Sequence, residues 1–299
     1  MKGLKKGLSS VFNYLEKNDK KKLQNYFKIS CLSLFTTLTA ILAFTVQAEI
    51  QLSGEIKQGG LIIGKTQPKS KVMLNERILP VSTNGDYVFA FSRNDKKEYQ
   101  LKITAPNGTV EQKKLVPTKR DYKISRIEGI SKKIMNPNKK ANVRAKQDSV
   151  AIKKVRKISS KLTDFSQGFI APRSSRITGV YGSQRFYNGV PKNPHYGVDY
   201  AGAIGAPVKA PASGEILLWV PDMFYSGGTL VIDHGHGITS NFLHLSESLV
   251  KVGDYVKQGQ VIAKVGNSGR VTGAHLDWRM NWHNVRFDPQ LAMKIVPLK

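Results

Sequence analysis

Residues 228–246 read GTLVIDHGHGITSNFLHLS, two runs of β-forming residues separated by glycines. Val, Ile, Thr and Phe are favoured in strands, and Gly between two such runs favours a turn. We therefore predict two strands here. Similar short runs surround this stretch, with Gly, Pro and Asn at the breaks between them: RITGVYG, GVDYAG, PVKAPASGEILLWV, DYVKQGQVIAKVG and HLDWRM. Residues 166–299 are thus predicted to form an all-β domain of hairpins, with polar chemistry at strand ends and loops.

Two further segments precede this domain. Residues 49–116 contain the strand-like runs KVMLN, YVFAF and YQLKITA, separated by turn sequences such as Asn84-Gly85-Asp86, and predict a small β domain. Residues 117–165 are strongly basic, and we interpret them as a partly helical or flexible linker. This linker is expected to lie along an anionic membrane or wall surface, with a solvated spacer of no binding role as the alternative.

The N-terminal segment, residues 1–48, has the pattern of an export signal. A Lys-rich stretch precedes an apolar run at 29–46, ISCLSLFTTLTAILAFTV, and Val46-Gln47-Ala48 offers small residues at a cleavage site. A cleaved signal peptide and an uncleaved inner-membrane anchor both fit, and either one predicts a periplasmic location. Cys31 is the single cysteine, so neither an intramolecular disulfide nor a multi-cysteine metal site is expected.

The formal net charge of the chain, +26, is unevenly distributed. Residues 166–299 contain 13 Lys and Arg against 8 Asp and Glu, so +21 of the charge lies upstream of them. A basic segment of this kind favours polyanionic partners. Nucleic acid is not the expected partner, because the basic runs lack interleaved aromatic residues and the chain carries an export pattern.

A nucleotide-binding motif occurs at residues 59–66. Gly59-Gly-Leu-Ile-Ile-Gly64-Lys65-Thr66 matches the P-loop pattern in full. That motif requires a helix after the loop, so that the helix N-terminus can hold the phosphates. Gln67-Pro68 and another strand-like run follow instead, so we predict a β-hairpin and no nucleotide site.

Metal-ligating side chains recur at even spacing in the C-terminal region. His195 and Asp199 are four residues apart, and His275 and Asp277 are two apart. Even spacing places side chains on one face of a strand. His244 lies in the apolar segment NFLHL, where a buried imidazole needs a partner. Three such ligands around one cleft can hold zinc and leave a position open for water, while the remaining histidines move protons.

The same residues carry a resemblance to a known family. The segments HYGVDY (195–200), GAPVKA (205–210), GEI (214–216), FLHL (242–245), GNSG (266–269) and TGAHL (272–276) follow one another as in the lysostaphin-type (LytM-like) zinc endopeptidases. The resemblance covers about residues 175–290. It implies an all-β sandwich hydrolase that cuts peptide cross-links of peptidoglycan. By this resemblance His195 and Asp199 are zinc ligands, and His244 and His275 are the catalytic histidines.

Asp277 departs from the family pattern, which has histidine as the third zinc ligand. Aspartate also binds zinc, but with Zn²⁺ the formal charge of the site falls from +1 to zero, which weakens the metal as a Lewis acid. We expect a zinc endopeptidase with His195, Asp199 and Asp277 as ligands and peptidoglycan as substrate; an active enzyme that selects a harder metal is a further outcome. The alternative is a degenerate, non-catalytic domain that binds the wall and regulates other murein hydrolases through a protein partner.

Overall fold

A computed structural model describes residues 50–129 and 138–298. The apolar run at 29–46 and Cys31 lie outside these ranges. Within the described ranges, no helix has both the length and the apolar character needed to cross a membrane.

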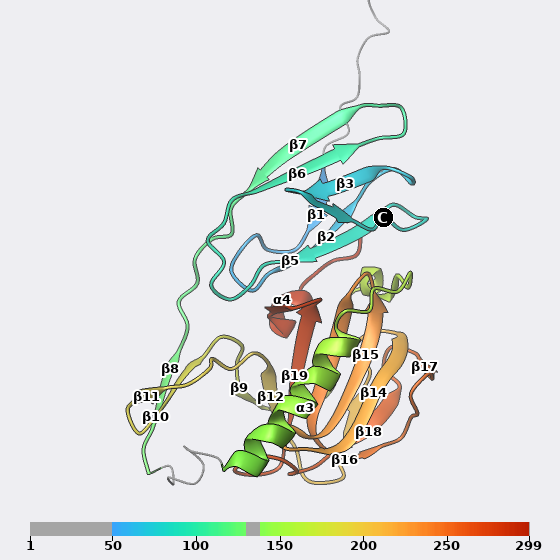
Figure 1. The fold of residues 1–299 in the computed structure, drawn as a ribbon. Helices are drawn as coiled ribbons and strands as arrows, with labels where there is room; N and C mark the ends of the chain where they lie inside the picture. Colours follow the sequence, from blue (N-terminus) through green and yellow to red (C-terminus); the bar gives the residue numbers. More distant parts are fainter. Residues whose placement is uncertain (1–49, 130–137, 299) are drawn as a thin grey trace, which may run out of the picture. The chain divides into compact units, whose positions relative to one another are not determined.

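The first part of the described chain, shown in blue and blue-green in Figure 1, forms two small sheets. One sheet has the order β1-β2-β5 and contains β1 (Gln51–Ser53), β2 (Leu61–Lys65) and β5 (Asp86–Ala90). The other has the order β4-β3-β6-β7 and contains β4 (Arg77–Leu79), β3 (Lys71–Leu74), β6 (Tyr99–Thr104) and β7 (Val110–Leu115). In β6 the buried residues Leu101 and Ile103 alternate with exposed Lys and Gln, the pattern of a strand with one face on a core.

The P-loop-like segment lies in this region as a strand. β2 covers Leu61–Lys65 and pairs antiparallel with β5. The next element along the chain is β3, beginning at Lys71, where a phosphate-binding loop would continue into a helix. The glycines instead allow close packing, since a Cβ at Gly64 would lie 2.1 Å from the ring of Tyr87.

The basic segment 117–165 contributes a strand and a helix among its described residues. β8 (Ile124–Ile127) pairs in parallel with β10 (Gln184–Tyr187), which also pairs with β11 (Val190–Pro191). Helix α3 (Lys139–Val155) starts at Asn138, whose side chain caps the N–H of Ala141. Figure 1 shows α3 running beside β14. An Asp148 oxygen accepts a hydrogen bond from the Phe224 N–H at 2.7 Å, which attaches the helix to this strand.

The C-terminal part is dominated by one large sheet whose main path is β17-β14-β15-β16-β19-β12-β9. Its strands are β9 (Ile177–Gly179), β12 (Val198–Ala201), β13 (Pro207–Lys209), β14 (Gly214–Met223), β15 (Gly227–Gly235), β16 (Ile238–Ser248), β17 (Tyr255–Val256), β18 (Val261–Val265), β19 (His275–Trp282) and β20 (Val285–Phe287). Two short helical segments accompany it, η1 (Asp164–Gln167) and α4 (Pro289–Ala292).

The 228–246 stretch forms the centre of this sheet. β15 and β16 pair antiparallel around the glycine turn at 235–237, and every residue of β15 is buried. Phe242 and Trp278 are cross-strand partners in β16 and β19 and are both completely buried. Burial of such aromatic side chains supplies much of the hydrophobic stabilisation. The predicted all-β class is confirmed, while the predicted boundaries at residues 116 and 165 stay predictions.

Candidate metal centre

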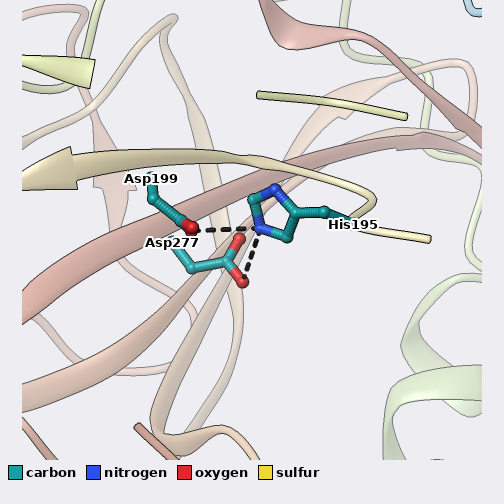
Figure 2. Close-up of side chains that lie close together, drawn as sticks. All are labelled: His195, Asp199 and Asp277. Carbon is teal, nitrogen blue, oxygen red and sulfur yellow. Dashed lines mark ion pairs between the residues drawn. The ribbon is translucent and has the colours of Figure 1, made fainter. Parts of the chain in front are cut away.

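Two neighbouring strands bring two carboxylates together. Asp199 of β12 lies directly opposite Asp277 of β19 in an antiparallel register, so both side chains point to the same face of the sheet. His195 precedes β12 in the chain. Its Nε2 is 3.0 Å from Asp199 Oδ1 and 3.4 Å from Asp277 Oδ2 (Figure 2). The structure therefore clusters the three residues that the sequence analysis proposed as metal ligands.

His195 reaches this cluster from a loop. The sequence analysis placed His195 and Asp199 on one strand, but β12 begins only at Val198. Backbone hydrogen bonds hold the loop: the N–H of His195 donates to Ser183 and its carbonyl accepts from Gly182, at 2.9 and 2.7 Å. These hydrogen bonds, and not the alternation of side chains along a strand, orient the imidazole toward Asp199.

Two of the ligand atoms in the cluster are buried without a hydrogen bond. His195 Nδ1 is 3.3 Å from the Val180 carbonyl oxygen, which can only accept, so Nδ1 carries a proton and Nε2 is the nitrogen that faces the carboxylates. His195 Nε2 and Asp199 Oδ1 are both buried without a hydrogen bond. Buried polar atoms are rarely left without a partner. A divalent cation bound by these atoms would satisfy both of them, so the residues present fit a metal ion.

The electrostatics of the cluster favour a cation. Burial opposes protonation of His195, yet the negative charges of Asp277 and Asp199 raise its pKa to about 9. Burial acts to raise the pKa of the Asp277 carboxyl, but the charges of Arg279 and His195 hold it well below its usual range. A site that draws a proton onto a buried imidazole in this way also attracts a metal ion in the proton's place.

Two arginines, absent from the predicted site, contact the carboxylates. Arg279 Nε lies 3.0 Å from both oxygens of Asp277, and Arg279 Nη2 also bonds Oδ2. Arg185 Nη2 is 3.4 Å from Asp199 Oδ2. Arg279 follows Asp277 by two residues on β19, so the same period-two rule that groups His275 with Asp277 would have included it. Its guanidinium offsets the additional negative charge of the aspartate.

The two histidines proposed as catalytic lie beside the cluster. The imidazoles of His244 and His275 have centroids 4.9 Å apart, and His275 Nε2 is 3.9 Å from Asp199 Oδ1. Each Nδ1 is 2.9 Å from a backbone carbonyl oxygen, of Ser268 and Gly273 respectively, so each Nε2 is free to accept a proton. Burial lowers the pKa of His244, which keeps this ring neutral at pH 7. Its φ of +64° is uncommon for a residue with a Cβ and is typical of functional sites.

Two glycines make room for the carboxylates. A Cβ at Gly179, the β9 partner of Asp199, would lie 2.2 Å from Asp199 Oδ2. A Cβ at Gly197 would lie 2.4 Å from Asp277 Oδ1. Neither glycine has a positive φ, so the requirement is for space. The sequence analysis did not identify either residue as part of the site, since their role depends on strand pairing.

The cluster opens into a cleft of about 630 Å³. All five proposed site residues line it, together with four arginines and two aromatic residues: Arg176, Arg185, Arg270, Arg279, Tyr187 and Tyr225. Tyr181 does not line this cleft: it is buried, and its hydroxyl donates to the Arg286 carbonyl oxygen at 2.8 Å.

The other histidines lie outside the cluster. His234 is completely buried, with Nδ1 2.7 Å from the Ser213 carbonyl oxygen and Nε2 2.8 Å from Ser240 Oγ. His236 packs against the ring of Phe165. His283 follows the end of β19 that is distant from His275, and its backbone N–H donates to the Gly237 carbonyl oxygen. It therefore cannot join the cluster.

Comparisons with known proteins agree with this geometry. Residues 193–289 match the family model described as Peptidase family M23. The chain is 44% identical to the peptidoglycan DD-endopeptidase ShyB of Vibrio cholerae over 34% of this chain and 23% of ShyB. It is 38% identical to lysostaphin of Staphylococcus simulans over 33% of this chain and 20% of lysostaphin. The matched region thus spans less than a quarter of these curated relatives.

A solved structure extends the likeness in fold. A structure described as a peptidase M23 from Pseudomonas aeruginosa superposes with a TM-score of 0.62, covering 80% of this chain and 96% of that one, at 22% identity. This likeness concerns the fold alone. The family match and the identities confirm, over residues 193–289, the resemblance to this peptidase family that was inferred from the sequence.

Proposed function

We propose that this protein is a zinc-dependent endopeptidase that hydrolyses peptide cross-links of bacterial peptidoglycan. The observation that carries the proposal is the buried cluster of His195, Asp199 and Asp277, in which His195 Nε2 and Asp199 Oδ1 lack hydrogen bonds. One imidazole and two carboxylates suit zinc and leave a coordination position open. The peptidoglycan substrate is inferred from the names of two matched relatives, the peptidoglycan DD-endopeptidases ShyB and ShyA of Vibrio cholerae.

Zinc at this cluster would supply Lewis-acid polarisation of the scissile carbonyl and would acidify the attacking water. The chain's own residues supply the proton transfers. His244, kept neutral by burial and fixed through its Nδ1, presents Nε2 as the general base. His275 faces the same space from the start of β19. The imidazole that takes the proton from the water stabilises the developing oxyanion by its positive charge, and it then delivers this proton to the leaving amine nitrogen as the peptide bond breaks.

Asp277 takes the place of a third histidine ligand under this proposal. Arg279 bonds both of its oxygens and contributes one positive charge. With Zn²⁺, a neutral His195, two carboxylates and this guanidinium, the formal charge returns to +1. The dyad of Asp277 and Arg279 therefore substitutes electrostatically for a neutral imidazole.

Location and partners belong to the proposal as well. The periplasmic assignment rests on the export pattern of residues 1–48, outside the described residues. The exposed basic residues of α3, such as Lys139 and Lys153, support an anionic membrane or wall surface as a partner of the basic segment. A regulatory protein partner stays a prediction.

Digestion of purified peptidoglycan tests the function, with the released fragments identified by mass. Wild-type protein should release cross-link fragments, and His244→Ala should lower the rate by about 10²–10⁴-fold because the general base is lost, while its zinc content stays at the wild-type level. Chelation should abolish release, and added zinc should restore it. Wild-type protein that holds no stoichiometric zinc and releases no fragments would instead support the non-catalytic regulator.

A further inference from the structure

A second polar site adjoins the metal centre on the side of helix α3. A cavity of about 220 Å³ lies between α3 and the sheet, and its lining includes Lys153, Arg156, Arg279 and Arg286. An adjacent cavity of about 440 Å³ also includes Lys153, Arg156 and Arg286. Three guanidinium groups and one ammonium group therefore converge beside α3.

Arg156 has no partner among the described residues. It is the C-terminal cap of α3, and its backbone N–H bonds the helix, but its side-chain Nε is buried without a hydrogen bond. No carboxylate of the described chain lies within ion-pair distance of its guanidinium. Arginine has five donors and is nearly always paired when it is buried. The buried Nε of Arg156, on a side chain with no carboxylate partner among the described residues, therefore indicates a ligand that the protein chain does not supply.

The surroundings of Arg156 and Arg286 disfavour their positive charges. Burial and the nearby charges of Arg286 and Arg279 lower the pKa of Arg156 to about 9. Burial and Arg279 also lower the pKa of Arg286, whose guanidinium stacks on the Tyr196 ring at 4.4 Å. An anion beside these two guanidinium groups would oppose both the effect of burial and the repulsion.

The negative groups nearby do not neutralise the cluster. Asp148 lines the smaller cavity, but its carboxylate accepts the Phe224 N–H and forms no ion pair with these arginines. The C-terminal end of the α3 dipole contributes about half a negative charge. Asp277 forms an ion pair with Arg279 at the metal centre and does not pair with Arg156 or Arg286. With Arg279 neutralised by Asp277, the charges of Lys153, Arg156 and Arg286 are offset by Asp148 and the helix dipole to about +1.5, which suits a phosphate group of about −1.5 to −2 at pH 7.

We propose that Arg156, Arg279 and Arg286 form a binding site for a phosphate group, separate from the metal centre and linked to it by Arg279. The volume of the smaller cavity corresponds to about seven water molecules, which is enough for phosphate with part of its hydration shell. Arginine forks suit phosphate geometry. The site does not depend on the proposed peptidase function, because none of the three arginines is a metal ligand.

Calorimetric titration of the full-length protein with inorganic phosphate tests the site. The titration is run at about 0.15 M NaCl, where exposed charges are screened, and in the presence of EDTA, so that phosphate cannot bind through a metal ion. Arg156→Gln should weaken binding at least tenfold, because charge-assisted bonds are lost, and Arg156→Lys should show an intermediate loss. Lys146→Gln is the matched control: it makes the same charge change on an exposed position of α3 outside both cavities.

Thermal unfolding gives a second measurement that does not assume a stable variant. Without phosphate, Arg156→Gln should melt at or above the wild-type temperature, because it removes a buried, unpaired charge. Phosphate should raise the melting temperature of wild type and Lys146→Gln more than that of Arg156→Gln. Equal responses of the three proteins, or binding that EDTA eliminates, would overturn the proposal.

Vesicles identify the source of the phosphate. Phosphatidylglycerol vesicles are compared with phosphatidylcholine vesicles, using wild type, Arg156→Gln and Lys146→Gln. A loss of phosphatidylglycerol binding specific to Arg156→Gln places the group on a lipid headgroup. Retention of vesicle binding by Arg156→Gln, together with its loss of inorganic phosphate binding, assigns the site to free phosphate. Either result upholds the site, whereas Arg156→Gln behaving like Lys146→Gln in both assays refutes it.

Discussion

His195 and His234 are both buried in the same β-rich region, but their surroundings shift their pKa values in opposite directions. The imidazole of His234 has a partner on each nitrogen, the Ser213 carbonyl and the Ser240 hydroxyl, and burial lowers its pKa to about 4. The imidazole of His195 faces two carboxylates with Nε2 unsatisfied, and its pKa rises to about 9. Burial alone therefore does not mark a functional histidine. A buried imidazole whose nitrogen faces two carboxylates does mark one.

Arg279 extends this comparison to a pair of sites. On one side it forms an ion pair with Asp277 of the proposed metal centre. On the other it lines a cavity with Arg156 and Arg286. One guanidinium thus lies between a cluster of carboxylates and a cluster of arginines, which suit ligands of opposite charge.

Metal content should separate the two histidines most strongly. His195→Ala removes the donor that has no other partner, so bound zinc should fall from about one per chain to near zero. His234→Gln should keep its zinc, because His234 has no contact with the cluster. Elemental analysis after dialysis against zinc measures both variants. Equal zinc content in the two variants would contradict the proposed difference between His195 and His234.

A fall in pH should lower the free energy of unfolding through the protonation of His234. Its pKa is depressed from 6.5 to about 4 in the folded state, so the unfolded chain binds the proton first as pH falls. The contribution is fully present above pH 6.5, is lost progressively between pH 6.5 and 4, and amounts to about 3 kcal/mol. Urea unfolding of wild type and His234→Gln at several pH values measures this loss. His236 and His283 also have lowered pKa values, so the variant should show a shallower dependence on pH, and an unchanged slope would contradict the assignment.

Removing the charge of Asp277 should destabilise the metal-free protein. Asp277→Asn leaves the Arg279 guanidinium without its ionic partner. Breaking a buried pair costs about 3–5 kcal/mol, but the Arg279 side chain is 29% exposed, so about 2 kcal/mol is expected after allowance for solvent screening. Urea unfolding in EDTA gives the value. The double variant Asp277→Asn/Arg279→Gln should recover part of the loss, and strictly additive effects would show that the pair contributes nothing.

A single methyl group should disturb the metal centre by the smallest amount. Gly179→Ala places a Cβ 2.2 Å from the present position of Asp199 Oδ2, so the carboxylate must move. Metal affinity should fall by about 10–100-fold, as for other changes that misorient a ligand. Competition with a chromogenic chelator measures the affinity. Gly273→Ala, whose added methyl group meets no atom within 4 Å, is the control and should bind metal like the wild type.

Local patterns in the chain were enough to predict much of the fold. The alternation of β-formers and glycines around residues 228–246 indicated hairpins, since strand propensity and turn chemistry act over a few residues. The even spacing of His275 and Asp277 placed both on one face of a strand, and β19 has this arrangement. The family resemblance then grouped His195, Asp199, His244 and His275 in one cleft, where the structure also finds them.

Only the tertiary structure decided which atoms meet. The aspartates at 199 and 277 are 78 positions apart along the chain, and the register of β12 on β19 places them opposite each other. The loop hydrogen bonds that aim His195, the space left by Gly179 and Gly197, and the convergence of Arg156 with Arg279 and Arg286 depend on segments distant in sequence. Short-range pattern encodes strand, face and turn, because these follow from the local backbone. Contact between ligands depends on register and packing, which are properties of the folded chain as a whole.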